Sequence, residues 1–263
     1  MKFKTIIEPF RIKMVEPIHL STEEQRIGYL KQAHYNPFLL NSNQVLIDFL
    51  TDSGTSAMSS DQWSAMMNGD ESYAGASSWL RFEKEVQSLT GMPFVLPTHQ
   101  GRAAERILYG KLGGKGKTFI SNTHFDTTRA NIEFSGAEAI DIPVKEGLDF
   151  ASDFPFKGNM DIALLEKTIA EKGAANIGAV ILTVTNNSGG GQPVSMENAK
   201  SVANVCRKNK VLFVIDCCRV AENSYYIHHN EAGYENKSYR QIAEEMMCLG
   251  DAAVMSAKKD ALV

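Results

Sequence analysis

The stretch Ala179-Val180-Ile181-Leu182-Thr183-Val184 is an almost continuous apolar run, and the polar, glycine-rich stretch Asn186-Asn187-Ser188-Gly189-Gly190-Gly191 follows it. An apolar run of this length predicts a strand that is buried on both faces of a parallel sheet. The asparagines and glycines predict a loop at the end of that strand, and Ser195 then predicts the start of a helix. The segment therefore indicates one strand–loop–helix unit of an α/β protein.

The same plan recurs elsewhere in the chain. We predict a strand at 94–96 with a helix from Arg102, a strand at 117–121 with a helix from Thr127, and a strand at 211–215 that ends on Asp216. Alternating strands and helices predict a mostly parallel sheet with helices on both faces. Ligands bind outside the carboxyl ends of such strands, so the polar residues after each apolar run are the candidate site residues.

The first ninety residues predict a different organisation, an arm that leads into a domain. Ser21 and Glu24 resemble a capping box for a helix over 22–33, and residues 45–50 predict a short strand. A short helix is expected over 61–68. A further helix is expected to begin with Ser78 as its N-cap and to end at Gly91.

Composition excludes several classes of protein. The 263 residues include 27 basic and 31 acidic side chains, a net charge of −4, without a basic run that would bind a phosphate backbone. We find neither a signal peptide pattern at the start nor an apolar segment of about 20 residues, so we expect a cytoplasmic protein that binds neither nucleic acid nor membrane. The four cysteines lack metal-type spacing and are expected to be reduced core thiols.

Two strand ends carry side chains that would suit different parts of one ligand. Gln100-Gly101-Arg102 opens a helix, so backbone N–H groups and a guanidinium could converge on a phosphate; the alternative is a tight turn with a surface arginine. Asp216 follows five apolar residues, so its carboxylate must be hydrogen-bonded or paired. Arg219 is its obvious ion-pair partner. An acid and an arginine there also match a partner for a pyridinium nitrogen.

A third candidate lies near the end of the chain, where the run Val254-Met255-Ser256-Ala257 leads to Lys258, Lys259 and Asp260. A lysine that leaves a buried strand can be partly desolvated, which lowers its pKa and lets the neutral amine form a Schiff base. A Lys-Lys pair alone more often lies on the solvent-exposed surface of a protein. Together, a phosphate cradle, an anion for a ring nitrogen and an amine for an aldehyde predict pyridoxal phosphate.

Six motifs across the chain resemble the β-eliminating lyases of the aminotransferase fold, the family that comprises tryptophanase and tyrosine phenol-lyase. They are Glu8-Pro9-Phe10-Arg11, residues 50–55, residues 69–75, residues 97–102, residues 190–195 and residues 256–260. The resemblance implies the large domain of fold type I (aspartate aminotransferase-like) pyridoxal-phosphate enzymes. It assigns residues 1–55 to an N-terminal arm with part of a small domain, and residues 56–263 to the cofactor-binding large domain.

The resemblance also implies site residues. It implies cofactor contacts at Gln100, Gly101, Arg102 and Ser256 (phosphate), Phe125 (stacked ring), Asp216 (pyridine nitrogen), and Asn187 and Arg219 (ring oxygen). Lys259 matches the Schiff-base residue that removes the substrate α-proton, and Tyr73 a proton donor that reaches a neighbouring subunit's site. Glu71 and the carbonyl of Gly54 match ligands of a monovalent cation, usually potassium. Shared sites of this kind imply a homotetramer.

One position indicates the amino-acid substrate. Tyrosine phenol-lyases have a threonine after the stacking aromatic residue, whereas tryptophanases have an aspartate, and this chain has Asp126. An indole N–H only donates, so a carboxylate acceptor suits it. The resemblance thus implies conversion of L-tryptophan to indole, pyruvate and ammonia; elimination of phenol from tyrosine is the alternative. Asp126 could instead be an ordinary N-cap before Thr127.

The chain departs from the family where it stops, at Val263. Family members continue beyond the lysine into the rest of the large domain and a small domain with the arginine that grips the substrate carboxylate. Two alternatives follow from this departure. The sequence is either a fragment of a longer enzyme, or a truncated, non-catalytic chain that binds the cofactor weakly or serves as a partner for full-length subunits.

Overall fold

The computed structural model describes residues 17–54 and 57–261, and the chain divides into two compact units, Met1–Asp52 and Ser53–Val263. The motif at residues 8–11 lies outside the described residues. The assignment of 1–55 to an arm with part of a small domain, and of 56–263 to a cofactor-binding domain, stays a prediction.

The first unit contains helix α1 (Glu23–Gln32) and two short 3-10 helices, Pro37–Leu39 and Ser42–Gln44. The predicted capping box is wrong by one residue. Thr22 is the N-cap, and its hydroxyl accepts from the Gln25 N–H while the Gln25 side chain accepts from the Thr22 N–H. The predicted strand at 45–50 is also wrong, because no neighbouring strand pairs with it in the described part of the chain; Phe49 is 91% exposed.

Two helices precede the sheet in the second unit. Helix α2 (Ser60–Met67) confirms the prediction over 61–68. Helix α3 (Ser77–Thr90) ends at Gly91, whose φ of 68° lies in the left-handed region that glycine tolerates. Ser78 is not its N-cap: the Asp70 carboxylate, seven residues upstream, accepts the N–H groups of Ser77 (2.6 Å) and Ser78 (2.8 Å).

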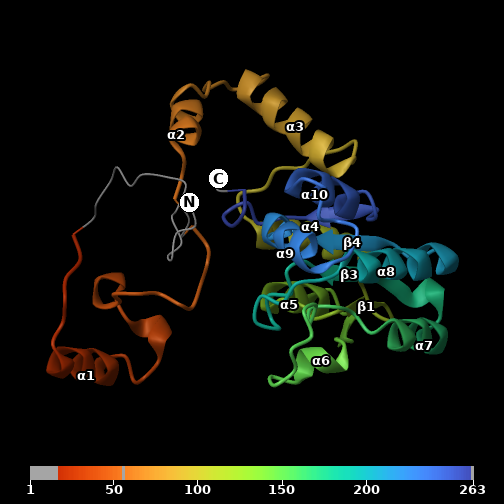
Figure 1. Ribbon diagram of the computed structural model, residues 1–263, viewed down its shortest axis with the longest axis horizontal. Helices are drawn as coiled ribbons and strands as arrows, with labels where there is room; N and C mark the ends of the chain where they lie inside the picture. The colour runs from red at the N-terminus through yellow and green to blue at the C-terminus, as the bar shows by residue number, and fades with distance from the viewer. Residues whose placement is uncertain (1–16, 55–56, 262–263) are drawn as a thin grey trace. The chain divides into compact units, whose positions relative to one another are not determined.

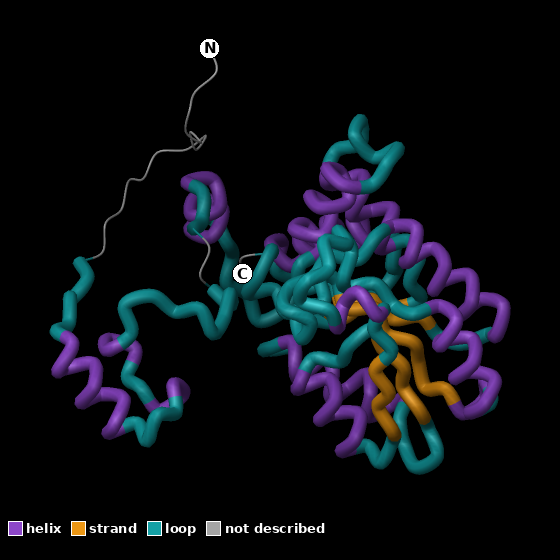
Figure 2. Tube along the Cα trace, turned by 60° about the horizontal axis from the view of Figure 1, so that its bottom comes forward, coloured by secondary structure: helices purple, strands orange, loops and turns teal. Residues whose placement is uncertain are grey.

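Five parallel strands form one sheet in the order β2-β1-β3-β4-β5, which confirms the α/β class and the parallel sheet. Figure 1 labels β1, β3 and β4 of this sheet, and Figure 2 draws the strands in orange. The strands are β1 (Thr118–Ser121), β2 (Glu138–Asp141), β3 (Ile177–Thr183), β4 (Phe213–Asp216) and β5 (Ala252–Val254). The predicted strand at 94–96 is wrong. Those residues pair with no strand of the described chain, and Phe94 is 90% exposed.

Helices cover both faces of the sheet, as the apolar runs predict. The remaining helices are α4 (Gly101–Leu112), α5 (Asp126–Phe134), α6 (Lys145–Leu148), α7 (Ile162–Lys172), α8 (Met196–Asn209), α9 (Val220–Asn230) and α10 (Tyr239–Met247), with a 3-10 turn at Ala174–Asn176. Alternate strand residues point to opposite faces. Val180 and Ile215 belong to a large core with α7, α8, α9 and α10, whereas Ile181 and Val214 belong to a smaller core with α4 and α5.

No helix within residues 17–54 and 57–261 combines the length and the apolar character needed to cross a bilayer.

A charged cluster ties α8 to α10 at the edge of the larger core. The Glu245 carboxylate of α10 accepts from Lys200 of α8 (2.7 Å), from the Tyr234 hydroxyl (2.8 Å) and from Lys237. Although partial burial favours the neutral acid, these three hydrogen bonds lower the pKa of Glu245 to about 2.

Glu245→Gln is therefore expected to lower the melting temperature at neutral pH. The pKa of Glu245 in the folded chain lies below its ordinary value of 4.5, so its contacts stabilise the fold above pH 4.5 and lose that effect as pH falls through about 2. Thermal unfolding of both chains across that range measures the difference. A difference in melting temperature between the two chains that stays the same from pH 7 down to about pH 2 would contradict this stabilising role of Glu245.

Candidate active site

The carboxyl ends of three neighbouring strands lie level with one another. Thr183 of β3 pairs with Asp216 of β4, and Asp216 pairs with Val254 of β5. The strand order reverses between β1 and β3, and ligands of open α/β sheets bind outside the carboxyl ends near such a switch. The sheet therefore places the loops after β1, β3, β4 and β5 along one edge.

A chain of hydrogen bonds connects Asp216 to Lys259 along that edge. The Cys218 thiol donates to Asp216 Oδ1 at 3.0 Å and accepts the Ser256 backbone N–H at 3.1 Å. The Lys259 ammonium donates to the Ser256 hydroxyl at 3.0 Å. Asp260 accepts the Ala221 and Glu222 N–H groups at the start of α9, which fixes the loop carrying the lysines. The structure thus brings together the predicted residues Asp216, Ser256 and Lys259.

The start of α4 lies directly against Ser256. A methyl group added at Gly101 would come within 2.8 Å of the Ser256 Cβ and 3.2 Å of its Cα, so only glycine permits this approach. Gln100 is the N-cap of α4 but makes no side-chain hydrogen bond to the helix. The first turn of α4 therefore presents backbone N–H groups beside a serine hydroxyl, a geometry that suits an anion.

Asp216 is almost fully buried, and the expected ion pair with Arg219 is absent between these two described residues. Burial raises the pKa of Asp216, while the Cys218 thiol and N–H, and the charges of Arg219 and Lys259, act in the opposite direction. Arg219 is itself buried, and its N–H donates to the Val184 carbonyl at the end of β3. A buried acid without an ion pair suits a cationic ligand atom.

The loops after β1 and β3 position the other predicted residues. Phe125 is the half-buried N-cap of α5, and Asp126 is its exposed first residue, so the alternative of Asp126 as N-cap is wrong. The Asp126 carboxylate accepts the Thr127 N–H at 2.6 Å. Asn187 lies in a tight turn after β3, where its carbonyl accepts the Gly190 N–H.

Glu105 is a buried residue of this region that the sequence analysis missed. Its carboxylate accepts the hydroxyls of Thr127 (2.7 Å) and Thr128, so it joins α4 to the first turn of α5. Burial raises its pKa, against the effect of the two hydroxyls. The sequence did contain a signal for this buried acid, because Glu105 lies on the apolar side of α4, beside Leu108 and Tyr109.

Tyr73 and Glu71 lie apart from this hydrogen-bonded chain, whereas Gly54 contacts the loop that carries the lysines. Tyr73 is fully exposed and Glu71 is exposed in the loop between α2 and α3, and neither makes a hydrogen bond or ion pair to another described residue. Gly54 donates its N–H to the Lys258 carbonyl at 2.8 Å. Within residues 17–54 and 57–261, no group of three or more His, Cys, Asp or Glu side chains could hold a metal ion.

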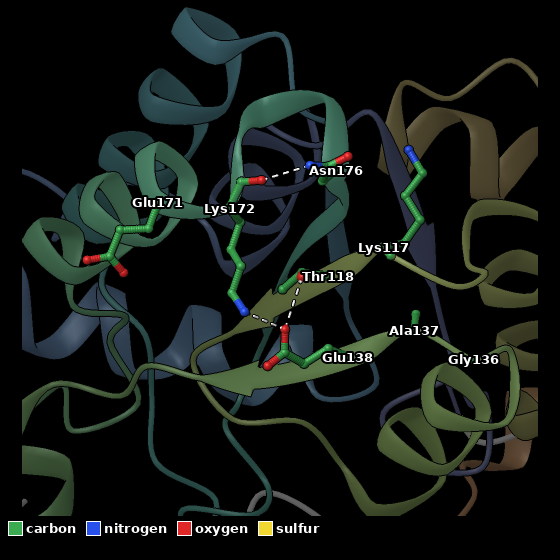
Figure 3. Close-up of a pocket in the computed structure, with 9 residues that line it drawn as sticks. Lys117, Thr118, Gly136, Ala137, Glu138, Glu171, Lys172 and Asn176 are labelled. Atoms are coloured by element: carbon green, nitrogen blue, oxygen red, sulfur yellow. Dashed lines mark hydrogen bonds and ion pairs between the residues drawn. The ribbon is translucent and has the colours of Figure 1, made fainter.

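A cavity of about 440 Å³ lies at the opposite edge of the sheet (Figure 3). Thr118 and Glu138, the first residues of β1 and β2, line it. Its charges are already paired: Lys172 binds Glu138 at 2.7 Å, and Lys117 donates to the Ala175 carbonyl. None of the predicted site residues lines this cavity.

Comparison with known proteins agrees with the family resemblance. The family profile described as Beta-eliminating lyase matches residues 48–263. A tryptophanase from Hyphomonas neptunium is 53% identical over 258 residues, which cover 98% of this chain and 57% of that protein. A tyrosine phenol-lyase from Pasteurella multocida is 46% identical over 256 residues, 97% of this chain and 56% of that protein.

A solved structure, described as a putative aromatic amino acid β-eliminating lyase/threonine aldolase from Exiguobacterium sp. 255-15, is similar over 87% of this chain and 51% of its own, with a TM-score of 0.44 and 16% identity. The chain spans a little over half the length of the curated relatives that it matches. Since the family profile covers most of the sequence, the chain belongs to the β-eliminating lyase family.

Proposed function

We propose that this chain binds pyridoxal phosphate at the carboxyl edge of its sheet and contributes to the β-elimination of L-tryptophan. The reaction consumes one water molecule and yields indole, pyruvate and ammonia. The observation that carries the proposal is the hydrogen-bonded connection from buried Asp216 through Cys218 and Ser256 to Lys259, beside the uncapped start of α4.

The residues present fit the cofactor. Gln100, Gly101 and Arg102 would hold the phosphate at the α4 N-terminus together with Ser256, because Gly101 and Ser256 are in close contact. A protonated ring nitrogen would give the buried Asp216 carboxylate the direct ion pair that no described residue forms with it. Phe125 is the candidate for stacking on the ring, and Asn187 and Arg219 are the candidates for its oxygen.

The bound cofactor supplies an electron sink for the α-carbon of the amino acid. Lys259 is the base that takes the α-proton, and its loop is fixed by the contacts of Asp260 with α9. Asp216 keeps the ring nitrogen protonated. Tyr73 is the candidate donor of the proton that the indole ring carbon needs before it can leave. Asp126 is the candidate acceptor for the indole N–H.

Tryptophan is favoured over tyrosine as the substrate by two observations. Asp126 presents an exposed carboxylate at the start of α5, which suits a substrate atom that donates a hydrogen bond. The tryptophanase relative is also more similar to this chain than the tyrosine phenol-lyase relative, at 53% against 46% identity. Release of phenol from tyrosine is the second candidate activity.

The proposal extends to assembly and location. Tyr73 and Glu71 lie on an exposed loop, which fits residues offered to a neighbouring subunit of a homotetramer. Glu71 and the Gly54 carbonyl are then the proposed ligands of a potassium ion. The four cysteines are unpaired thiols, which fits the reducing cytoplasm.

The assignment of Lys259 is tested by spectroscopy. The purified chain mixed with pyridoxal phosphate should develop the near-visible absorbance band of a lysine-bound cofactor, and borohydride reduction should leave the label on Lys259. Lys259→Ala should lose the band and any indole release, whereas Lys258→Ala should keep the band. A label on Lys258 would contradict the assignment. A wild-type chain without a band would support the alternative of a non-catalytic fragment.

The phosphate cradle is tested by two substitutions in one helix. Gly101→Ala places a methyl group 2.8 Å from the Ser256 Cβ, so it should separate α4 from Ser256 and weaken cofactor binding about tenfold or more. Gly110→Ala has open space around the new methyl group and should leave binding unchanged. Titration by absorbance measures both affinities. Equal affinities for the two variants would count against a phosphate at this helix.

The role of Asp126 is tested with two leaving groups. Asp126→Thr should reduce kcat/KM for tryptophan by about 10- to 100-fold, because the indole N–H loses a charged acceptor. Elimination from an S-alkylcysteine, whose thiolate leaves without a ring contact, should change little. Equal losses for the two substrates would show that Asp126 does not act on the indole ring.

A further inference from the structure

Cys218 occupies an unusual position between the two ends of the proposed site. Its thiol lies 3.0 Å from Asp216 Oδ1 and 3.1 Å from the backbone nitrogen of Ser256. Its carbonyl also accepts the Asp260 N–H at 3.4 Å. One residue therefore contacts the acid that ends β4 and two positions of the loop that follows β5.

The thiol is the only side chain of the described chain that makes a hydrogen bond to the Asp216 carboxylate. A thiol carries one hydrogen and weak acceptor lone pairs, so it can donate to the carboxylate while it accepts from Ser256. A donor to a buried carboxylate both offsets part of the desolvation cost and fixes the orientation of the carboxyl group. Loss of this donor would leave Asp216 held by backbone groups alone.

The adjacent cysteine has different surroundings. Cys217 is part of the large core under α8 and α10, and its thiol lies 3.5 Å from the Val254 carbonyl. It makes no hydrogen bond to the Asp216 carboxylate. The chain therefore contains a matched internal control for any substitution at Cys218.

We propose that Cys218 is a positioning residue, whose thiol holds the Asp216 carboxylate in place relative to the loop that carries Ser256 and Lys259. The inference rests on the proposed function, in which Asp216 partners a cofactor nitrogen and Lys259 receives the cofactor aldehyde. It gives a specific task to a thiol that the sequence alone places among ordinary core cysteines. Burial and the charge of Asp216 raise the pKa of this thiol, so it stays protonated and able to donate.

The contact itself is tested without the cofactor, by infrared spectroscopy of the S–H stretch. The Cys218 band is assigned from the difference between the wild-type chain and Cys218→Ser. We expect a band at lower frequency than that of a thiol without a charged acceptor, and a shift to higher frequency in Asp216→Asn, because an amide oxygen is a weaker acceptor than a carboxylate. The Cys217 band should stay in place. A Cys218 band that Asp216→Asn leaves unchanged would overturn the proposal.

The consequence for the site is tested by cofactor titration of three variants. Cys218→Ala should weaken pyridoxal phosphate binding about tenfold or more, because Asp216 loses its donor. Cys218→Ser keeps a donor and an acceptor and should restore binding to within about threefold of wild type. Cys217→Ala should lower the melting temperature through lost packing and leave the affinity unchanged.

The outcomes distinguish the role of Cys218 from the proposed function of the chain. Equal affinities for Cys218→Ala and Cys217→Ala, with a wild-type band on Lys259, would overturn the role of Cys218 and leave the proposed function intact. A wild-type chain that forms no band counts against the proposed function, and the infrared measurement then decides on Cys218 by itself.

Discussion

The burial of the Asp216 carboxylate is the constraint on which the rest of the site depends. A carboxylate is costly to remove from water unless other groups compensate its charge. Here it ends a strand between two others, within a sheet covered on both faces, and the described chain offers it a thiol and a backbone N–H instead of an ion pair. The charges of Arg219 and Lys259 act on the carboxylate, but no described residue forms an ion pair with it, which fits the proposed contact with a cationic ring nitrogen.

Close packing of backbone segments serves the same site. Gly101 lets α4 approach Ser256 to a distance that no larger residue permits, and Asp260 holds the lysine loop against the start of α9. Glu105 joins α4 to α5 from within the core. Three helix N-termini, those of α4, α5 and α9, thus meet one edge of the sheet, and each contacts a residue from a different strand–helix segment of the same unit.

Sequence patterns predicted the parts of the fold that depend on local chemistry. The apolar runs before Asn186 and Asp216 are strands, and the helices near Arg102, Thr127 and Ser195 begin within a residue of their predicted starts.

The same reasoning was wrong at 45–50 and 94–96, since an apolar run does not specify whether a partner strand is present. The edge strand β2 was missed because it is short and half-exposed. Glu105 and Cys218 were missed because their roles arise from contacts between separate strand–helix units.

The two cores on the sheet differ greatly in size. Among the described residues, 28 buried side chains form the core shared with α7, α8, α9 and α10, but only eight form the core shared with α4 and α5. Helices held by fewer apolar contacts open at lower free energy, so the amide hydrogens of α4 and α5 should exchange with solvent earlier than those of α8. A ligand bound at the start of α4 would stabilise α4 and the smaller core against local unfolding. Occupancy of the site and the order of local unfolding would then be linked.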